Sequence, residues 1–185
     1  MVDVKALAKY LLKLNGEQYA ALGTEEPDTD ISPMKLQKLL YYCQGYALAI
    51  LEEPLFKDPI EAWAYGPVIN SVYQEYKGYK GGYIPVPSAS SEVRIDETAE
   101  KMARLVMNDK GRYSPGTLCE MTHREAPWKE VFAPRENNPL SLDTMREYFS
   151  SLFAQEISEE QELKAFRSQG SEPTRQEWGD ILHAL

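Results

Sequence analysis

Cys119 and His123 are the two residues whose types and spacing could support catalysis. They stand four positions apart in a segment with helical periodicity, so their side chains would share one helix face and could meet as thiolate and imidazolium. A thiol enzyme also needs a group that orients the histidine and donors for an oxyanion, and no motif supplies either. A small core cysteine beside a histidine near a helix end explains the same pair, so we predict no catalytic residue.

Metal and cofactor sites find no support in the sequence. The chain has two cysteines and two histidines, and none of them forms the closely spaced pairs that structural zinc sites use. The glycines Gly78, Gly81 and Gly82 match neither the phosphate-binding loop nor the dinucleotide fingerprint. We therefore predict no metal site and no cofactor.

The charge of the chain argues against direct nucleic-acid binding. Its 29 acidic and 20 basic side chains give a formal net charge of −9, and the basic residues are scattered singly. Proteins that bind duplexes gain most of their affinity by neutralising phosphates with Lys and Arg. The start of the chain lacks the pattern of a signal peptide, and no apolar run is long enough to span a bilayer. We expect a cytoplasmic protein with no membrane partner.

Helical periodicity dominates the chain and predicts an all-α fold, or nearly so. We expect an irregular bundle of roughly six to eight helices. The clearest helix begins with Ser32 as its cap and Pro33 in its first position, and an apolar face then continues to about Ile50. Alternating residues near 83–95 predict a minor two-stranded β-ribbon, which prolines would limit to an edge.

Weaker signals predict the remaining boundaries. The polar stretch Glu17–Asp30 indicates a loop, and Gly66 before Pro67 indicates a break with Pro67 opening a new helix. Ser158 and Thr174 each begin a capping-box pattern, which predicts two short C-terminal helices.

The terminal segment differs in character from the rest of the chain. We predict a helical domain over residues 1–153 and a helical extension over residues 154–185. Short helices with few apolar residues are marginal in water, so these need the main body or a partner. The candidate partner contacts in the extension are Phe166, Trp178, Ile181 and Leu182.

Two compact clusters combine aromatic and turn residues. One covers residues 63–67 and the other residues 123–128. Their tryptophans suit a core, but the polar groups of Tyr65, His123 and Glu125 would each cost about 1–3 kcal/mol if buried without a partner. A buried hydrogen-bonded network that joins the two clusters would explain them without any ligand.

Three segments of the chain resemble the motifs of one family. They are KLQKLLYY-Q at residues 35–44, EAW-YGPV at 61–68 followed by VY at 72–73, and TH-E-PW at 122–128. In this order and spacing they resemble the SocA/GepA-like phage-associated family, which carries the Panacea antitoxin domain, over residues 1–153. The signature residues, which serve the fold or a partner site, are Lys35, Leu36, Gln37, Lys38, Tyr41, Tyr42, Trp63, Tyr65, Gly66, Pro67, Val68, Tyr73, His123, Glu125, Pro127 and Trp128.

The resemblance implies a function that composition alone does not. In one branch of the family, an antitoxin binds and neutralises a protein toxin that is encoded beside it. A second branch resembles a proteolytic adaptor, which delivers its bound toxin to a ClpXP-type protease. The interpretation that follows is a protein-binding antitoxin and not an enzyme, with the adaptor and a thiol enzyme centred on Cys119 and His123 as alternatives.

Overall fold

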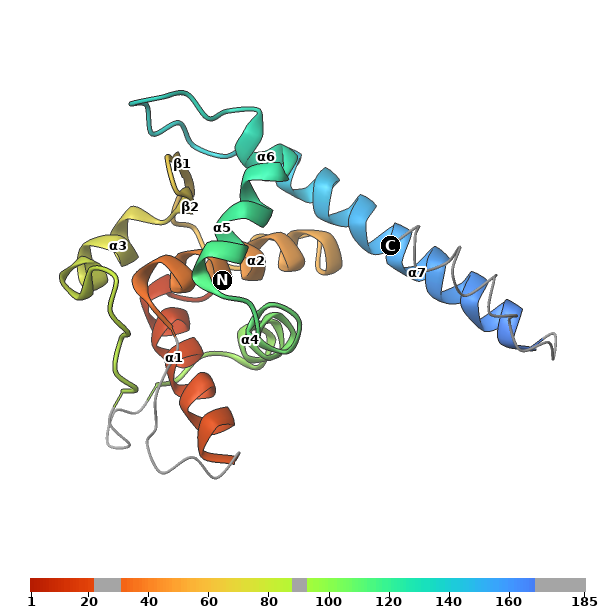
Figure 1. Cartoon of the computed structure of the whole chain (residues 1–185), viewed down its shortest axis with the longest axis horizontal. Coiled ribbons are helices and arrows are strands. Elements are labelled where there is room, and N and C mark those ends of the chain that lie inside the picture. The colour runs from red at the N-terminus through yellow and green to blue at the C-terminus, as the bar shows by residue number, and fades with distance from the viewer. Residues whose placement is uncertain (22–30, 88–92, 169–185) are drawn as a thin grey trace. The chain divides into compact units, whose positions relative to one another are not determined.

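The computed structural model describes residues 1–21, 31–87 and 93–168 (Figure 1). It divides into two compact units, Met1–Ser150 and Ser151–Leu185. The elements in chain order are α1 (Val4–Ala21), α2 (Pro33–Ile50), β1 (Glu61–Trp63), β2 (Gly66–Val68), α3 (Asn70–Tyr76), the short 3-10 helix η1 (Lys77–Tyr79), α4 (Glu97–Lys110), α5 (Pro115–Arg124), α6 (Ala126–Lys129) and α7 (Leu142–Ser168). The prediction of a nearly all-α fold with a minor ribbon is confirmed.

Helix α2 forms the centre of the first unit. Its start matches the prediction, because Ser32 accepts a hydrogen bond from the backbone N–H of Lys35 and Pro33 takes the first helical position. The helix contacts α1, α4, α5 and β2, which Figure 1 shows around it. It is therefore buried on all sides over most of its length, and its polar side chains must find partners inside the protein.

The ribbon lies elsewhere than predicted. It is an antiparallel hairpin of β1 and β2, in which Trp63 pairs with Gly66 across a two-residue turn. The described parts of the 83–95 segment, residues 83–87 and 93–95, contain no strand. Pro85 and Pro87 have no N–H to give to a ladder, and the backbone N–H of Ile84 donates to the carbonyl of Ile31 at 2.9 Å.

Pro67 does not begin a helix, so that prediction is wrong. The residue lies in β2, and the next helix, α3, begins three residues later at Asn70. Tertiary contacts decide the outcome, because side chains of α2 hold the backbone of Pro67 and Ile69 in an extended conformation. Gly66 supports the turn with a φ of 91°, which residues with a side chain rarely adopt.

Two helices are longer than their sequence signals indicated. Helix α1 continues to Ala21, so the first residues of the predicted loop 17–30 are helical and residues 22–30 lie outside the described part. Helix α7 runs through Ser158, which therefore does not start a new helix. The stretch after Phe153 is rich in Glu, Gln, Leu and Lys, whose helix propensity favours continuation. Thr174 lies outside the described residues.

Aromatic rings fill the space between α2 and the first turns of α7. Phe149 is fully buried, with its ring centre 5.5 Å from that of Tyr41 and 5.7 Å from that of Tyr46 in edge-on arrangements. Gly45 makes this approach possible, because a Cβ there would lie 2.1 Å from the Phe149 ring. These contacts anchor the part of α7 before Ser151 against α2.

Candidate functional site

The turn of the β1–β2 hairpin is held by side chains from the α5–α6 segment. The indole N–H of Trp128 donates to the carbonyl of Trp63 at 2.9 Å, and the thiol of Cys119 donates to the carbonyl of Tyr65 at 3.4 Å. The ring of His123 hydrogen-bonds the backbone of Ala64 between them. The bonds from Trp128 and His123 join the two aromatic clusters. Of the other polar groups that the sequence singled out, Tyr65 is 70% exposed and Glu125 bonds to two tyrosines of α2.

Lys38 of α2 holds the other side of the hairpin. Its ammonium donates to the carbonyl of Pro67 at 3.0 Å, although only 1% of the residue is exposed. Burial lowers the pKa of Lys38 to about 7, and the neighbouring Cys119 opposes this shift. Gly66 lets the lysine approach, because a Cβ there would lie 2.8 Å from the Lys38 Nζ and 2.7 Å from the Thr122 hydroxyl.

Glu125 forms a second buried polar centre, between α5 and α6. Its two carboxylate oxygens accept hydrogen bonds from the hydroxyls of Tyr41 and Tyr42, each at 2.7 Å. Burial raises the pKa of Glu125, while the two tyrosine hydroxyls and the charge of Lys110 oppose the shift. Every polar atom of this group is therefore used inside the protein, where it links α2 to the end of α5.

The side chains of two glutamines in α2 hydrogen-bond the backbone of connecting segments. Gln37 accepts from the N–H of Ile69 at 2.7 Å and donates to the carbonyl of the same residue at 3.4 Å. Gln44, seven residues further on the same helix face, accepts from the N–H of Leu55 at 2.9 Å and of Phe56 at 3.2 Å. Gln44 was not among the predicted site residues, and its place as the last residue of the KLQKLLYY-Q motif was the available signal.

Cys119 and His123 do come together as the sequence suggested. The thiol sulfur lies 3.7 Å from Nε2 of His123, and Cys119 is partly exposed. The imidazole stacks on Trp128 with ring centres 4.1 Å apart, and burial and the charge of Lys38 lower the pKa of His123. Both groups contact the hairpin backbone, so the pair works as a structural clamp in this arrangement.

Thr122 was also missed as a site residue. It is fully buried, and its hydroxyl donates to the carbonyl of Cys119 at 2.9 Å while it faces Gly66. Its place as the first residue of the TH-E-PW motif was the available signal, although a threonine that bonds the backbone of its own helix leaves no further pattern in the sequence.

The signature residues fall into an inner group and an outer group. Trp63 and Tyr73 are half-buried, with ring centres 4.9 Å apart, and Tyr65 is 70% exposed. His123 is half-buried on α5. The buried signature residues are Lys35, Leu36, Gln37, Lys38, Tyr41, Tyr42, Gly66, Pro67, Val68, Glu125, Pro127 and Trp128. The predicted partner residues of the extension, Phe166, Trp178, Ile181 and Leu182, have no described side chains.

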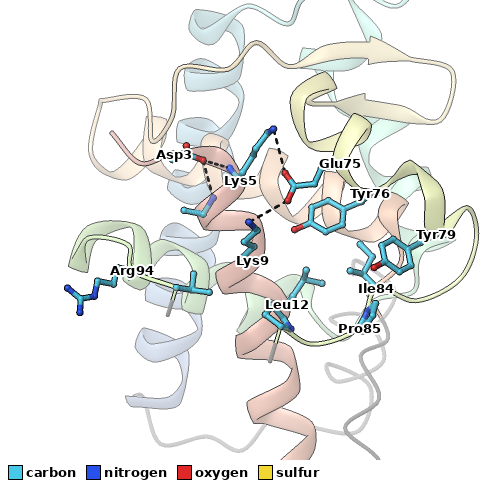
Figure 2. A pocket seen from close by; sticks show the side chains of 13 residues that line it. Asp3, Lys5, Lys9, Leu12, Glu75, Tyr76, Tyr79, Ile84, Pro85 and Arg94 are labelled. Carbon is cyan, nitrogen blue, oxygen red and sulfur yellow. Dashed lines mark hydrogen bonds and ion pairs between the residues drawn. The ribbon is translucent and has the colours of Figure 1, made fainter. Parts of the chain in front are cut away.

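A groove of about 810 Å³ opens between α1, α3 and the segment that follows η1 (Figure 2). Its floor includes Tyr76 and Tyr79, and its wall carries ion pairs in which Lys5 and Lys9 each lie 3.6 Å from Glu75. Burial and the charge of Glu75 raise the pKa of Tyr76 to about 12. The charged wall is already paired within the protein, and none of the signature residues lines this groove.

The described ranges contain neither a cluster of possible metal ligands nor a membrane-spanning helix. No three His, Cys, Asp or Glu side chains there gather closely enough to hold a metal ion. Within the same ranges, no helix combines the length and apolar character needed to cross a membrane.

Comparisons with known proteins agree on one family. The model of the family described as Antitoxin SocA-like, Panacea domain, matches residues 36–129, which include most of α2, the hairpin, α5 and α6. The chain is 30% identical over 142 residues to a protein named Antitoxin SocA from Caulobacter vibrioides (strain NA1000 / CB15N), and the match covers 70% of each chain. No solved structure gives a significant match.

Proposed function

Since this chain belongs to the SocA-like antitoxin family with the Panacea domain, we propose that it neutralises a protein toxin by binding it directly. A family of antitoxins implies toxin partners in general. The specific partner proposed for this chain is a toxin encoded in the adjacent open reading frame, met in the cytoplasm.

One structural observation supports binding over catalysis. The signature groups that could do chemistry are occupied with internal hydrogen bonds: Lys38 holds Pro67, His123 holds Ala64, and Glu125 accepts from two buried tyrosines. General acids and bases need access to a substrate, whereas these groups are turned to the backbone and core. Their arrangement instead gives the domain a defined surface, which a binding protein requires.

The adaptor function is the second candidate. Its support is the division of the chain into two compact units, Met1–Ser150 and Ser151–Leu185, because an adaptor must engage both a toxin and a ClpXP-type protease. In this version the extension, with its predicted contacts Phe166, Trp178, Ile181 and Leu182, would serve one of the two partners.

A thiol enzyme is the alternative from a different class. Its support is the 3.7 Å distance between the sulfur of Cys119 and Nε2 of His123. Such an enzyme would lose function in a Cys119→Ser variant that still folds. Full neutralising activity of Cys119→Ser would leave no role for the thiol in chemistry.

Co-expression with the adjacent open reading frame tests the proposal. We expect the neighbouring protein to stop growth alone, to be harmless beside this chain, and to co-purify with it. The cellular half-life of the neighbour, measured with and without the protease, separates the two binding functions: direct neutralisation leaves it unchanged, and an adaptor shortens it only when the protease is present. A harmless neighbour that does not co-purify contradicts both.

A further inference from the structure

The β1–β2 turn exposes a large aromatic side chain. Tyr65 is the second residue of the turn, 70% of it is exposed, and its hydroxyl has no partner among the described residues. Single exposed aromatic residues are common on protein surfaces and need no explanation by themselves. Tyr65 differs because the backbone that carries it is fixed from two sides.

Contacts within the chain fix the backbone of the turn in the absence of a partner. Trp128 and Cys119 hold the carbonyls of Trp63 and Tyr65 on one side, and Lys38 holds the carbonyl of Pro67 on the other. An aromatic side chain on a fixed backbone loses little conformational entropy when it binds. The hairpin therefore presents Tyr65 in a preorganised position, as binding anchors require.

Holding the turn with the buried Lys38 costs free energy of desolvation. An apolar side chain could fill the same volume without the desolvation of an ammonium that is 1% exposed. Natural proteins keep such locally unfavourable choices mainly where function needs them. The hairpin is thus positioned at a cost in stability.

The hairpin cannot recruit a partner by adding a strand. The outer edge of β1 is occupied, because Ala62 donates to the carbonyl of Asn138 at 2.8 Å and Leu140 donates to that of Ile60 at 2.7 Å. The strand β2 is buried along its whole length. Recognition at this hairpin must therefore use the side chains of its tip.

We propose that the hairpin tip, centred on Tyr65, is the surface through which this antitoxin binds its toxin. The inference rests on the proposed function and names its interface. An exposed turn is convex, so the matching toxin surface is a pocket with apolar walls for the phenol ring and a hydrogen-bonding group for its hydroxyl. Trp63, two residues before Tyr65 in the hairpin, is half-buried and packs edge-on against Tyr73, with ring centres 4.9 Å apart.

A second copy of the chain is a poorer occupant. The apolar hollow lined by Phe56, Ile60 and Met145, of about 340 Å³, could receive a ring, but it is a different surface from the tip. A contact between two different surfaces is head-to-tail and does not close into a two-fold dimer. A distinct protein with its own pocket fits the tip without this consequence.

The test compares two exposed tyrosines in the full-length chain. Tyr65→Ala removes the proposed anchor, and Tyr83→Ala is the matched control, because Tyr83 is 58% exposed and lies outside the hairpin. The probe is the purified protein from the adjacent open reading frame, with Kd measured by calorimetry and neutralisation by growth. We expect Tyr65→Ala to weaken binding by about 30-fold or more, with an unchanged melting temperature, and Tyr83→Ala to stay within about threefold.

The outcomes separate this inference from the proposed function. If the wild-type chain binds the neighbouring protein and Tyr65→Ala binds it equally well, the hairpin tip is not the interface, while the antitoxin proposal stands. Loss of binding in Trp178→Ala but not in Tyr65→Ala would assign the interface to the extension. If Tyr65→Ala instead dissolves an assembly of the chain with itself, the tip serves self-association. If the wild-type chain binds nothing, the proposed function fails first.

Discussion

The indole nitrogen of Trp128 lies 2.9 Å from the carbonyl oxygen of Trp63, and this hydrogen bond connects two clusters that are 65 residues apart in sequence. Trp128 also stacks on His123 and on Phe132, with ring centres 4.1 and 4.3 Å away. One side chain thus links the short helix α6, the end of α5 and the last residue of β1. The hairpin and the α5–α6 corner should therefore stabilise each other.

Trp128→Phe tests this link. Phenylalanine keeps the stacking but removes the N–H, so the Trp63 carbonyl loses its donor in a partly buried place. We expect a loss of about 1–2 kcal/mol in the free energy of unfolding, measured by urea denaturation. Trp63→Phe is the control, because the indole of Trp63 donates to the Glu61 carboxylate, which water can reach. The free energy of unfolding should therefore fall less in Trp63→Phe than in Trp128→Phe.

Glu125 should be required for folding and not for chemistry. Glu125→Ala leaves the hydroxyls of Tyr41 and Tyr42, whose residues are 0% and 1% exposed, without their acceptor. We expect a destabilisation of about 2–5 kcal/mol. Glu125→Gln retains one acceptor and a similar shape, so its free energy of unfolding should fall clearly less than that of Glu125→Ala. Equal losses in both variants would contradict the importance of this acceptor.

The same residue predicts a pH dependence. Burial raises the pKa of Glu125 in the folded protein, so the folded state binds this proton more tightly than the unfolded chain does. Its contribution to stability is fully present below the ordinary carboxyl pKa of about 4.3 and falls as the pH rises through the raised folded value. Urea denaturation from pH 4 upward should show this decline in the wild-type chain and a weaker decline in Glu125→Gln.

The sequence predicted those parts of the fold that depend on local signals. Ser32 caps α2 as expected, because a cap needs only the first turn of its own helix. The hairpin was missed because Pro67 after Gly66 has a helix-start pattern, and only contacts with Lys38 and Gln37, far away in sequence, make the segment extended.

The candidate site was partly predictable for the same reason. The sequence indicated that His123 and Glu125 need buried partners, and the structure supplies them. It could not indicate which partners, since Tyr41, Tyr42 and Glu125 meet only when α2 packs against the end of α5. The exposure of Tyr65 was equally hidden, because a tyrosine suits both a core edge and a surface.

Gly45 should not tolerate a side chain. A Cβ at this position would lie 2.1–2.6 Å from three atoms of the Phe149 ring, which is fully buried and cannot move aside. We expect Gly45→Ala to lower the free energy of unfolding by several kcal/mol, despite the better helix propensity of alanine. A lowered melting temperature would show this loss. Gly78→Ala is the matched control, because a Cβ at Gly78 would meet nothing within 4 Å and the stability should change little.

Lys38 should make the stability of the protein rise with pH above neutrality. Burial lowers its pKa from 10.5 to about 7, so between these values the unfolded chain binds the proton and the folded protein does not. At about 1.4 kcal/mol per pKa unit, the destabilising effect of the buried charge is on the order of 5 kcal/mol below pH 7 and disappears towards pH 10.5.

Lys38→Met keeps the length of the stem and removes the titrating group, at the expense of the hydrogen bond to Pro67. The free energy of unfolding of wild type relative to this variant should therefore increase by several kcal/mol between pH 6.5 and pH 9.5, as measured by urea denaturation at both values. Lys101→Met, at an exposed residue paired with Glu97, should show no such change. If the difference between wild type and Lys38→Met is the same at both pH values, Lys38 titrates normally and the hairpin is not held by a buried, readily deprotonated lysine.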